Sequence, residues 1–215
     1  LTPLEPMTEN QAIVFDNWEK NNMVLSGSAG TGKTFISLYL ALKDMLDKKT
    51  PYNKIMIVRS AVPTRDMGFL PGTQAEKEAA YTVPYQIIVN DLFQDKEAWN
   101  KLIQLKEISF VTTSYLRGMT YNNCILLVDV AQNCNYHELC SVITRVGHDC
   151  KFVMCGDYYQ TDFDKEKDKN GIVTFLSIIE QLKNFTVVEF GWQDIVRSSF
   201  VRDYIMTKEM MKING

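Results

Sequence analysis

One glycine-rich stretch constrains this chain more than any other feature: Gly27-Ser28-Ala29-Gly30-Thr31-Gly32-Lys33-Thr34. It matches the pattern Gly-x4-Gly-Lys-Ser/Thr and lies between the apolar run Met23–Leu25 and a stripe of apolar residues at helical spacing, Phe35, Leu38, Tyr39, Leu42 and Leu46. Glycines in this setting let the backbone fold so that successive N–H groups and the N-terminus of the helix are directed at one anion. A glycine-rich turn that binds nothing is the alternative, but it would not require both flanking elements. We therefore expect a phosphate-binding loop, in which Lys33 reaches the β- and γ-phosphates and the Thr34 hydroxyl ligates Mg²⁺.

Two kinds of periodicity alternate along the chain. Short runs rich in Ile, Val and Phe mostly lack polar alternation, which is typical of buried parallel strands; they lie at Met23–Leu25, Lys54–Val58, Ile108–Val111, Ile125–Val128, Phe152–Cys155 and Thr186–Phe190. Helical patterns follow at Asp95–Leu105, His137–Thr144, Ile172–Leu182 and Asp194–Met211. This order predicts an α/β fold, a doubly wound and mostly parallel sheet with helices on both faces. No linker divides the chain, so we expect one domain over residues 1–215.

Composition narrows the class of protein. Hydrophobic residues make up 46% and charged residues 23%, which excludes extended disorder and fibrous architectures. The net charge of −3 gives no overall basic field, so any nucleic-acid contact has to be local. No apolar run approaches the roughly 18 residues of a membrane span, and the first residues show no export signal. Because residue 1 is leucine, we expect a processed or trimmed chain.

Five cysteines, an odd number, lie mostly in apolar segments and favour a reducing cytoplasm. Cys134, His137 and Cys140 recur every three residues, which raises the alternative of a zinc site. No paired Cys-x-x-Cys supplies the remaining ligands, so a helix packing its inner face is the favoured interpretation.

A second motif supplies a carboxylate for a metal ion. Cys124-Ile-Leu-Leu-Val-Asp129 is an apolar strand that ends in aspartate, as in a Walker B strand. An aspartate at a strand end is often only a cap, but beside the phosphate loop we expect Asp129 to hold Mg²⁺ together with Thr34. Hydrolytic ATPases commonly continue with a glutamate that positions or deprotonates the attacking water, whereas this chain has Val130. Loss of such a base costs about 10²- to 10⁴-fold in rate, so we expect nucleotide binding to survive and hydrolysis to suffer.

Several motifs in order resemble the PhoH-like family: the glycine-rich loop, Gly68-Phe69-Leu70-Pro71-Gly72 with Glu76-Lys77, Tyr115 to Thr120, Val128 to Asn133, Thr144 to Gly147, Gly156-Asp157-Tyr158-Tyr159-Gln160-Thr161-Asp162 and Asp194 to Arg197. The resemblance covers about residues 8 to 201. It implies a RecA-like P-loop ATPase similar to the first motor domain of superfamily 1 helicases. Many members are phage-encoded, so the resemblance also implies a phage protein in the host cytoplasm. The family pattern reads Asp-Glu-Ala-Gln where this chain has Asp129-Val130-Ala131-Gln132.

The resemblance assigns roles to further residues. It implies that Gln11 reads adenine; a solvent-facing glutamine is the alternative. It also implies that Gln160 senses the γ-phosphate and that Asp157 holds the loop of Gln160 in place. The cationic candidates for the transferring phosphate are Arg197, Arg59, Arg145 and Arg117, with Arg197 first; an ordinary ion pair is the alternative for each.

The implied cofactors and partners are ATP, Mg²⁺, RNA or single-stranded DNA, and copies of the chain in a ring, with a hexamer favoured. Arg65, Phe69 and Lys77 could offer charge and a stacking platform to the nucleic acid. A switch that binds ATP without productive turnover is the main alternative function, and a small-molecule kinase is a third, disfavoured by the Gly-Asp-x-x-Gln motif.

Overall fold

The computed structural model describes residues 1–60, 73–116, 118–158 and 171–211. In these ranges, six strands form one sheet in which every neighbouring pair is parallel, in the order β3-β2-β4-β5-β1-β6. The strands are β1 (Asn22–Gly27), β2 (Lys54–Arg59), β3 (Ile108–Thr112), β4 (Cys124–Val128), β5 (Lys151–Gly156) and β6 (Phe185–Phe190). All six predicted strands are therefore confirmed, as is the RecA-like α/β P-loop fold.

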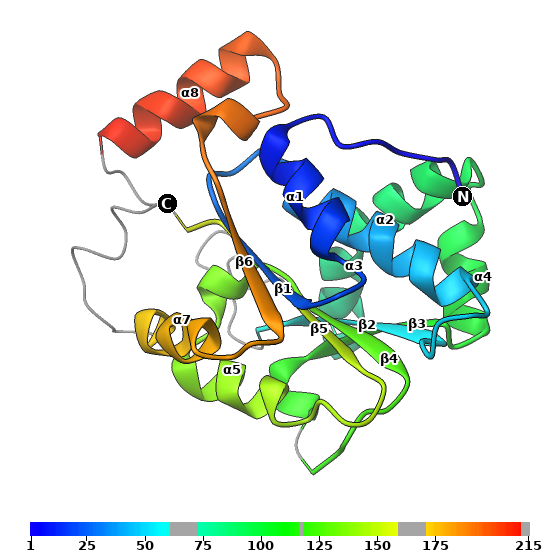
Figure 1. Cartoon of the computed structure of the whole chain (residues 1–215). Coiled ribbons are helices and arrows are strands. Elements are labelled where there is room, and N and C mark those ends of the chain that lie inside the picture. Colours follow the sequence, from blue (N-terminus) through cyan, green and yellow to red (C-terminus); the bar gives the residue numbers. More distant parts are fainter. Residues whose placement is uncertain (61–72, 117, 159–170, 212–215) are drawn as a thin grey trace.

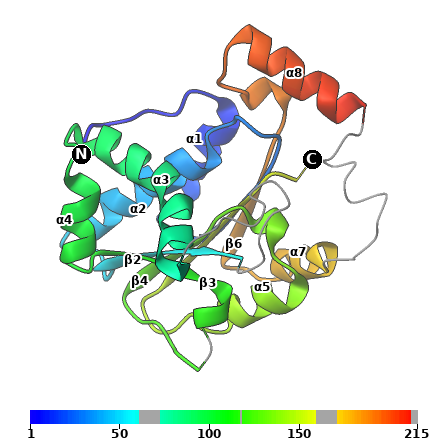
Figure 2. The same ribbon diagram turned by 180° about the vertical axis from the view of Figure 1, so that it is seen from behind.

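Helices cover both faces of this sheet (Figure 1). On one face lie α1 (Glu9–Asn17), α2 (Lys33–Leu46), α3 (Gln74–Phe93) and α4 (Ala98–Gln104), and on the other α5 (Tyr136–Ile143) and α7 (Ile172–Glu180). The last helix, α8 (Ser199–Met210), stands apart from both layers near the carboxyl ends of the strands (Figures 1 and 2). The short 3₁₀ helices are η2 (Thr113–Tyr115), η3 (Ala131–Asn133) and η4 (Trp192–Asp194). None of the helices in the described ranges is long and apolar enough to cross a membrane.

Successive residues of the central strands enter two separate cores. In β1, Met23 and Leu25 pack with α1 to α4, whereas Val24 packs with α5 and α7. The same alternation holds in β4, where Ile125 faces the first core and Leu126 the second. Burial on both faces explains why these strands read as continuous apolar runs rather than as alternating ones.

Two helices were not predicted from the sequence. For α3, the start is fixed by a capping box in which the Thr73 hydroxyl accepts from the Glu76 N–H and the Glu76 carboxylate accepts from the Thr73 N–H. Pro84 lies inside this helix, and its apolar residues form no single stripe, which hid the pattern. The other is α1, capped by Thr8. The predicted helix Asp194–Met211 is shorter, because η4 and an extended residue, Ile195, precede α8.

Candidate nucleotide site

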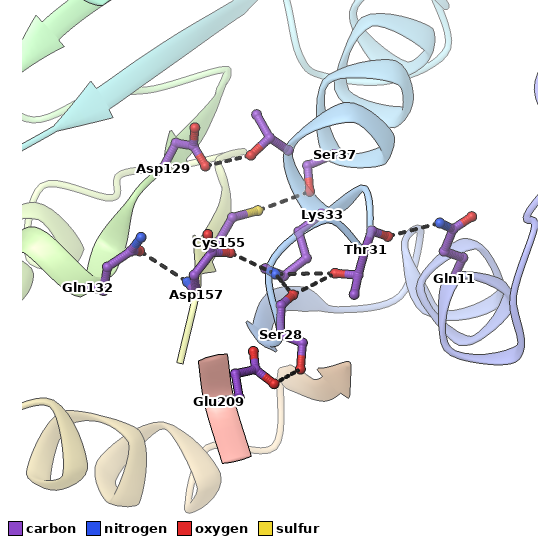
Figure 3. A network of polar contacts seen from close by, with 11 residues as sticks. Gln11, Ser28, Thr31, Lys33, Ser37, Asp129, Gln132, Cys155, Asp157 and Glu209 are labelled. Carbon is purple, nitrogen blue, oxygen red and sulfur yellow. Dashed lines mark hydrogen bonds and ion pairs between the residues drawn. The ribbon is translucent and has the colours of Figure 1, made fainter. Parts of the chain in front are cut away.

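The glycine-rich loop joins β1 to α2 at the carboxyl edge of the sheet, where Asp129 and Asp157 also emerge from β4 and β5 (Figure 3). Gly27 has φ +127°, and a Cβ there would lie 2.0 Å from the Phe190 carbonyl oxygen on neighbouring β6. Only glycine allows this approach, in which the Ser28 N–H donates to that same oxygen at 3.0 Å. Gly30 and Gly32 also have positive φ, and Gly32 is the N-cap of α2. The loop thus turns directly into a helix start, the setting that favours an anion.

Lys33 is buried, and its ammonium group is held inside the loop. Nζ donates to the Ser28 carbonyl oxygen at 2.6 Å and to Thr31 Oγ1 at 3.2 Å. It also pairs with Asp157 Oδ1 at 2.9 Å (Figure 3). A buried lysine that remains charged requires such partners. The cation therefore sits beside the loop amides, where phosphate oxygens could bind both.

Within the described part of the chain, each carboxylate oxygen of Asp129 accepts a hydrogen bond from one side chain. Thr34 Oγ1 donates to Oδ1 at 2.8 Å, and the Tyr85 hydroxyl of α3 donates to Oδ2 at 2.7 Å. A hydroxyl and a carboxylate are hard oxygen donors of the kind that Mg²⁺ prefers. Thr34 and Asp129 fit a magnesium ion in chemistry and in mutual position, while Tyr85 fixes the orientation of the carboxylate.

Burial dominates the electrostatics of Asp129. It raises the pKa of the Asp129 carboxyl, although hydrogen bonds from Tyr85, Thr34 and the Val130 N–H and the nearby charge of Arg59 each lower it. The pKa of the Tyr85 phenol is likewise raised well above its ordinary value, first by burial and then by Asp129. A bound divalent cation would offset the cost of an ionised carboxylate here.

Val130 has a left-handed backbone conformation, with φ 50° and ψ 44°, where β4 turns into η3. This region is unfavourable for a β-branched residue. The isopropyl group of Val130 itself carries no acid or base, and its effect on hydrolysis stays a prediction. The residue combines backbone strain with a side chain that cannot accept a proton.

A model of the PhoH-like protein family matches residues 3–209 of this chain. The chain belongs to the PhoH-like family. It is 31% identical over 204 residues to the PhoH-like protein of Mycobacterium leprae strain TN, which covers 94% of the chain and 57% of that relative. It is 30% identical over 201 residues to Protein PhoH of Escherichia coli strain K12, which covers 92% of the chain and 56% of that relative. The chain thus spans just over half the length of these PhoH relatives, and the family is one of P-loop ATPases.

Gln11 of this PhoH-like chain is buried rather than solvent-facing. Its Oε1 accepts from the Met7 N–H at 2.9 Å, and its Nε2 donates to the Thr31 carbonyl oxygen at 3.0 Å. Both ends of the amide are therefore engaged, and one of them holds the phosphate loop. The structure brings Gln11 to the site as a support for the loop; adenine reading stays a prediction.

Of the four candidate arginines, two lie near the site, one lies away from it and one falls outside the described residues. Arg197 lies over the loop, since a Cβ at Gly30 would come within 2.9 Å of its Cγ, and its side chain is exposed. Arg59 ends β2, faces the Tyr81 ring at 5.0 Å and acts electrostatically on Asp129. Arg145 lies at the opposite edge of the sheet, where its carbonyl oxygen accepts from Tyr121 just before β4 begins. The structure does not bring Arg145 to the site, and Arg117 lies outside the described residues, as does Gln160.

Three residues make contacts at the site that the sequence did not predict. Tyr85 was not singled out because nothing in the sequence links α3 to β4. Gln132 Oε1 accepts from the Asp157 N–H at 3.1 Å, and its place in the family motif was the available signal. Glu209 of α8 accepts from Ser28 Oγ at 3.0 Å (Figure 3). It also accepts from the Trp192 indole N–H.

The zinc alternative finds no support in the part of the chain that the structure describes. No group of three or more His, Cys, Asp or Glu side chains there could hold a metal ion. Cys134 is buried, Cys140 is half-buried and His137 is exposed, so the three do not converge.

Proposed function

We propose that this chain binds Mg-ATP in the loop Gly27 to Thr34 and acts as an ATP hydrolase whose turnover is limited by Val130. The contact between Thr34 Oγ1 and Asp129 Oδ1, 2.8 Å long and next to the Lys33 ammonium, carries the proposal. It supports a metal-binding pair and a phosphate-binding cation at the carboxyl edge of the sheet, where β1 and β4 end on either side of β5. Residues 1–215 would constitute one P-loop NTPase domain.

The chain's own groups would divide the work. Lys33 exchanges the Ser28 carbonyl and Asp157 for phosphate oxygens, and the amides of the loop and the first turn of α2 stabilise the phosphate charge. When bound, Mg²⁺ would neutralise part of the phosphate charge. Asp129 and Thr34 would hold the ion, and Tyr85 keeps the carboxylate oriented. Arg197, exposed over the loop, is the candidate for the charge that develops on the transferring phosphate.

Water activation is where this chain departs from its family. Proton transfer to a positioned base contributes about 10²- to 10⁴-fold, and Val130 supplies none. Tight binding with slow release of phosphate would make the chain a nucleotide-dependent switch or assembly module. We keep this as the second function because it rests on one specific residue.

Nucleic acid and oligomerisation enter through the family resemblance. We propose RNA or single-stranded DNA as the partner. We also propose that copies of the chain form a ring, with a hexamer favoured, in which a neighbouring copy completes the nucleotide site. The proposed location is the cytoplasm. Arg65 and Phe69 lie outside the described residues, as does the side chain of Lys77, so their role in nucleic-acid binding stays a prediction.

One experiment separates the two functions. Steady-state phosphate release is measured with and without single-stranded RNA, alongside the affinity for Mg-ATP. Release that RNA stimulates several-fold would support the helicase-like ATPase and eliminate the switch. Tight binding with turnover at the uncatalysed background would support the switch. Absence of binding would refute both.

A further inference from the structure

Two free cysteines meet at the edge of the sheet opposite the nucleotide site. Cys124 is the first residue of β4, and Cys150 directly precedes β5. The register pairs Ile125 with Lys151, so the two cysteines face each other one position earlier. Their Sγ atoms are 3.3 Å apart and share a hydrogen bond.

We propose that Cys124 and Cys150 form a reversible intrachain disulfide, which makes this strand edge a redox modification site for low-molecular-weight disulfides. The sulfur atoms need to close from 3.3 Å to the bonded distance of about 2.0 Å. Each cysteine directly follows a turn residue with left-handed backbone, Asn123 with φ 55° and Asp149 with φ 52°, so neither sulfur is carried by the middle of a strand.

The environment distinguishes the two thiols. Cys124 is buried, whereas Cys150 is only half-buried and is the more accessible of the two residues. Cys150 Sγ also donates to the Tyr121 carbonyl oxygen at 3.0 Å. The hydrogen bond with the Cys124 side chain lowers the pKa of Cys150 to about 6, although burial acts in the opposite direction. The pKa of Cys124 is raised, first by its hydrogen bond with Cys150 and then by burial. Because Cys150 is the more exposed of the two, we assign it as the thiol that attacks first, as its thiolate, and Cys124 as the resolving thiol.

The chemistry balances with glutathione disulfide as the oxidant. The Cys150 thiolate attacks one glutathione sulfur, the glutathione S–S bond breaks, and one glutathione thiolate leaves. The Cys124 thiol then loses its proton and attacks the Cys150 sulfur, which releases the second glutathione thiolate. Two cysteine thiols have lost two electrons and two protons, and glutathione disulfide has been reduced to two thiols.

Peptide mapping of the whole chain tests the proposal. The reduced protein is exposed to glutathione disulfide, free thiols are blocked with N-ethylmaleimide, and the digest is analysed by mass spectrometry. We expect the Cys124–Cys150 link to exceed every other cysteine pair by at least about tenfold, and to disappear with dithiothreitol. In urea this selectivity should vanish, because it depends on the folded register.

Two variants complete the design. Cys140→Ser, which changes a half-buried cysteine on α5, should keep the link, and Cys150→Ser should abolish it while leaving Cys124 reduced. Links that favour Cys134 or Cys140, or a glutathione adduct on Cys150 that never resolves, would overturn the proposal. Mapping of the unaltered chain remains decisive even if a variant folds poorly.

Discussion

Among single residues, Val130 makes the sharpest prediction about rate. It stands where the family pattern has glutamate, and its left-handed backbone adds strain for a β-branched side chain. Val130→Glu should raise steady-state phosphate release at least about tenfold, because a carboxylate can accept a proton from the attacking water. Val130→Gln has similar length but no base, so its rate should stay within about twofold of the parent. Equal rates for the Glu and Gln variants would show that another group activates the water.

The buried carboxyl of Asp129 makes a prediction about pH. Burial raises the pKa of this carboxyl in the folded protein, so the protonated form stabilises the fold. This contribution to folding stability is fully present below the ordinary Asp pKa of about 3.9, and it is lost as pH rises through the raised pKa. Magnesium binding has the opposite sign, since it needs the carboxylate. The magnesium-dependent gain in nucleotide affinity should therefore decline as pH falls toward and through the raised pKa of Asp129.

Asp129→Asn is the matched control for that titration. The amide keeps the shape and can still pair with Thr34 and Tyr85, but it removes the buried charge. The variant should melt no lower than the parent in thermal denaturation without metal, and its magnesium-dependent gain in affinity should be small at every pH. An unchanged pH profile in the variant would assign the titration to another group.

Motif residues could be predicted and their supporting residues could not. Lys33, Thr34 and Asp129 lie where the spacing of the motifs placed them, because strand ends of a parallel sheet meet at one edge. Tyr85 and Glu209 reach the site from segments far away in the sequence, so their contacts depend on tertiary packing that periodicity does not encode.

At the scale of elements, buried strands were easier to predict than helices. The central strands lie between two cores and carry continuous apolar runs, whereas α3 mixes small, polar and apolar residues around Pro84. Helix α8 buries none of its residues fully, which leaves Phe200 and Tyr204 largely exposed. Its attachment to the rest of the chain depends on a few contacts, and Glu209 makes two of them.

This attachment predicts an effect on affinity. The Glu209 carboxylate lies against Ser28 of the phosphate loop, so its negative charge should oppose a triphosphate. Glu209→Gln removes the charge, keeps an acceptor for Ser28 and Trp192, and should tighten ATP binding by about threefold to tenfold in calorimetry. Glu180→Gln, an exposed change on α7, serves as the control and should leave affinity unaltered. Weaker binding by Glu209→Gln would mean that the charge supports the loop rather than opposing the nucleotide.

For the whole molecule, the sequence predicted the layers but not the order of strands. Apolar runs on every central strand require cover on both faces, which gave the doubly wound architecture. The order β3-β2-β4-β5-β1-β6 places β5 between the phosphate loop and Asp129, and no local pattern specifies that insertion. This order places Asp157, at the end of β5, next to Lys33. Asp129 follows β4, one strand farther from β1, and contacts Thr34 from there.

Binding of Mg-ATP is the central claim, and isothermal titration calorimetry tests it most directly. The parent chain should bind Mg-ATP saturably, and Lys33→Ala, checked for intact folding by circular dichroism, should lose at least about 2 kcal/mol of binding free energy, because one charge-assisted partner of the phosphates is gone. Binding that is equally tight in both proteins, or no heat from a folded parent, would contradict the account.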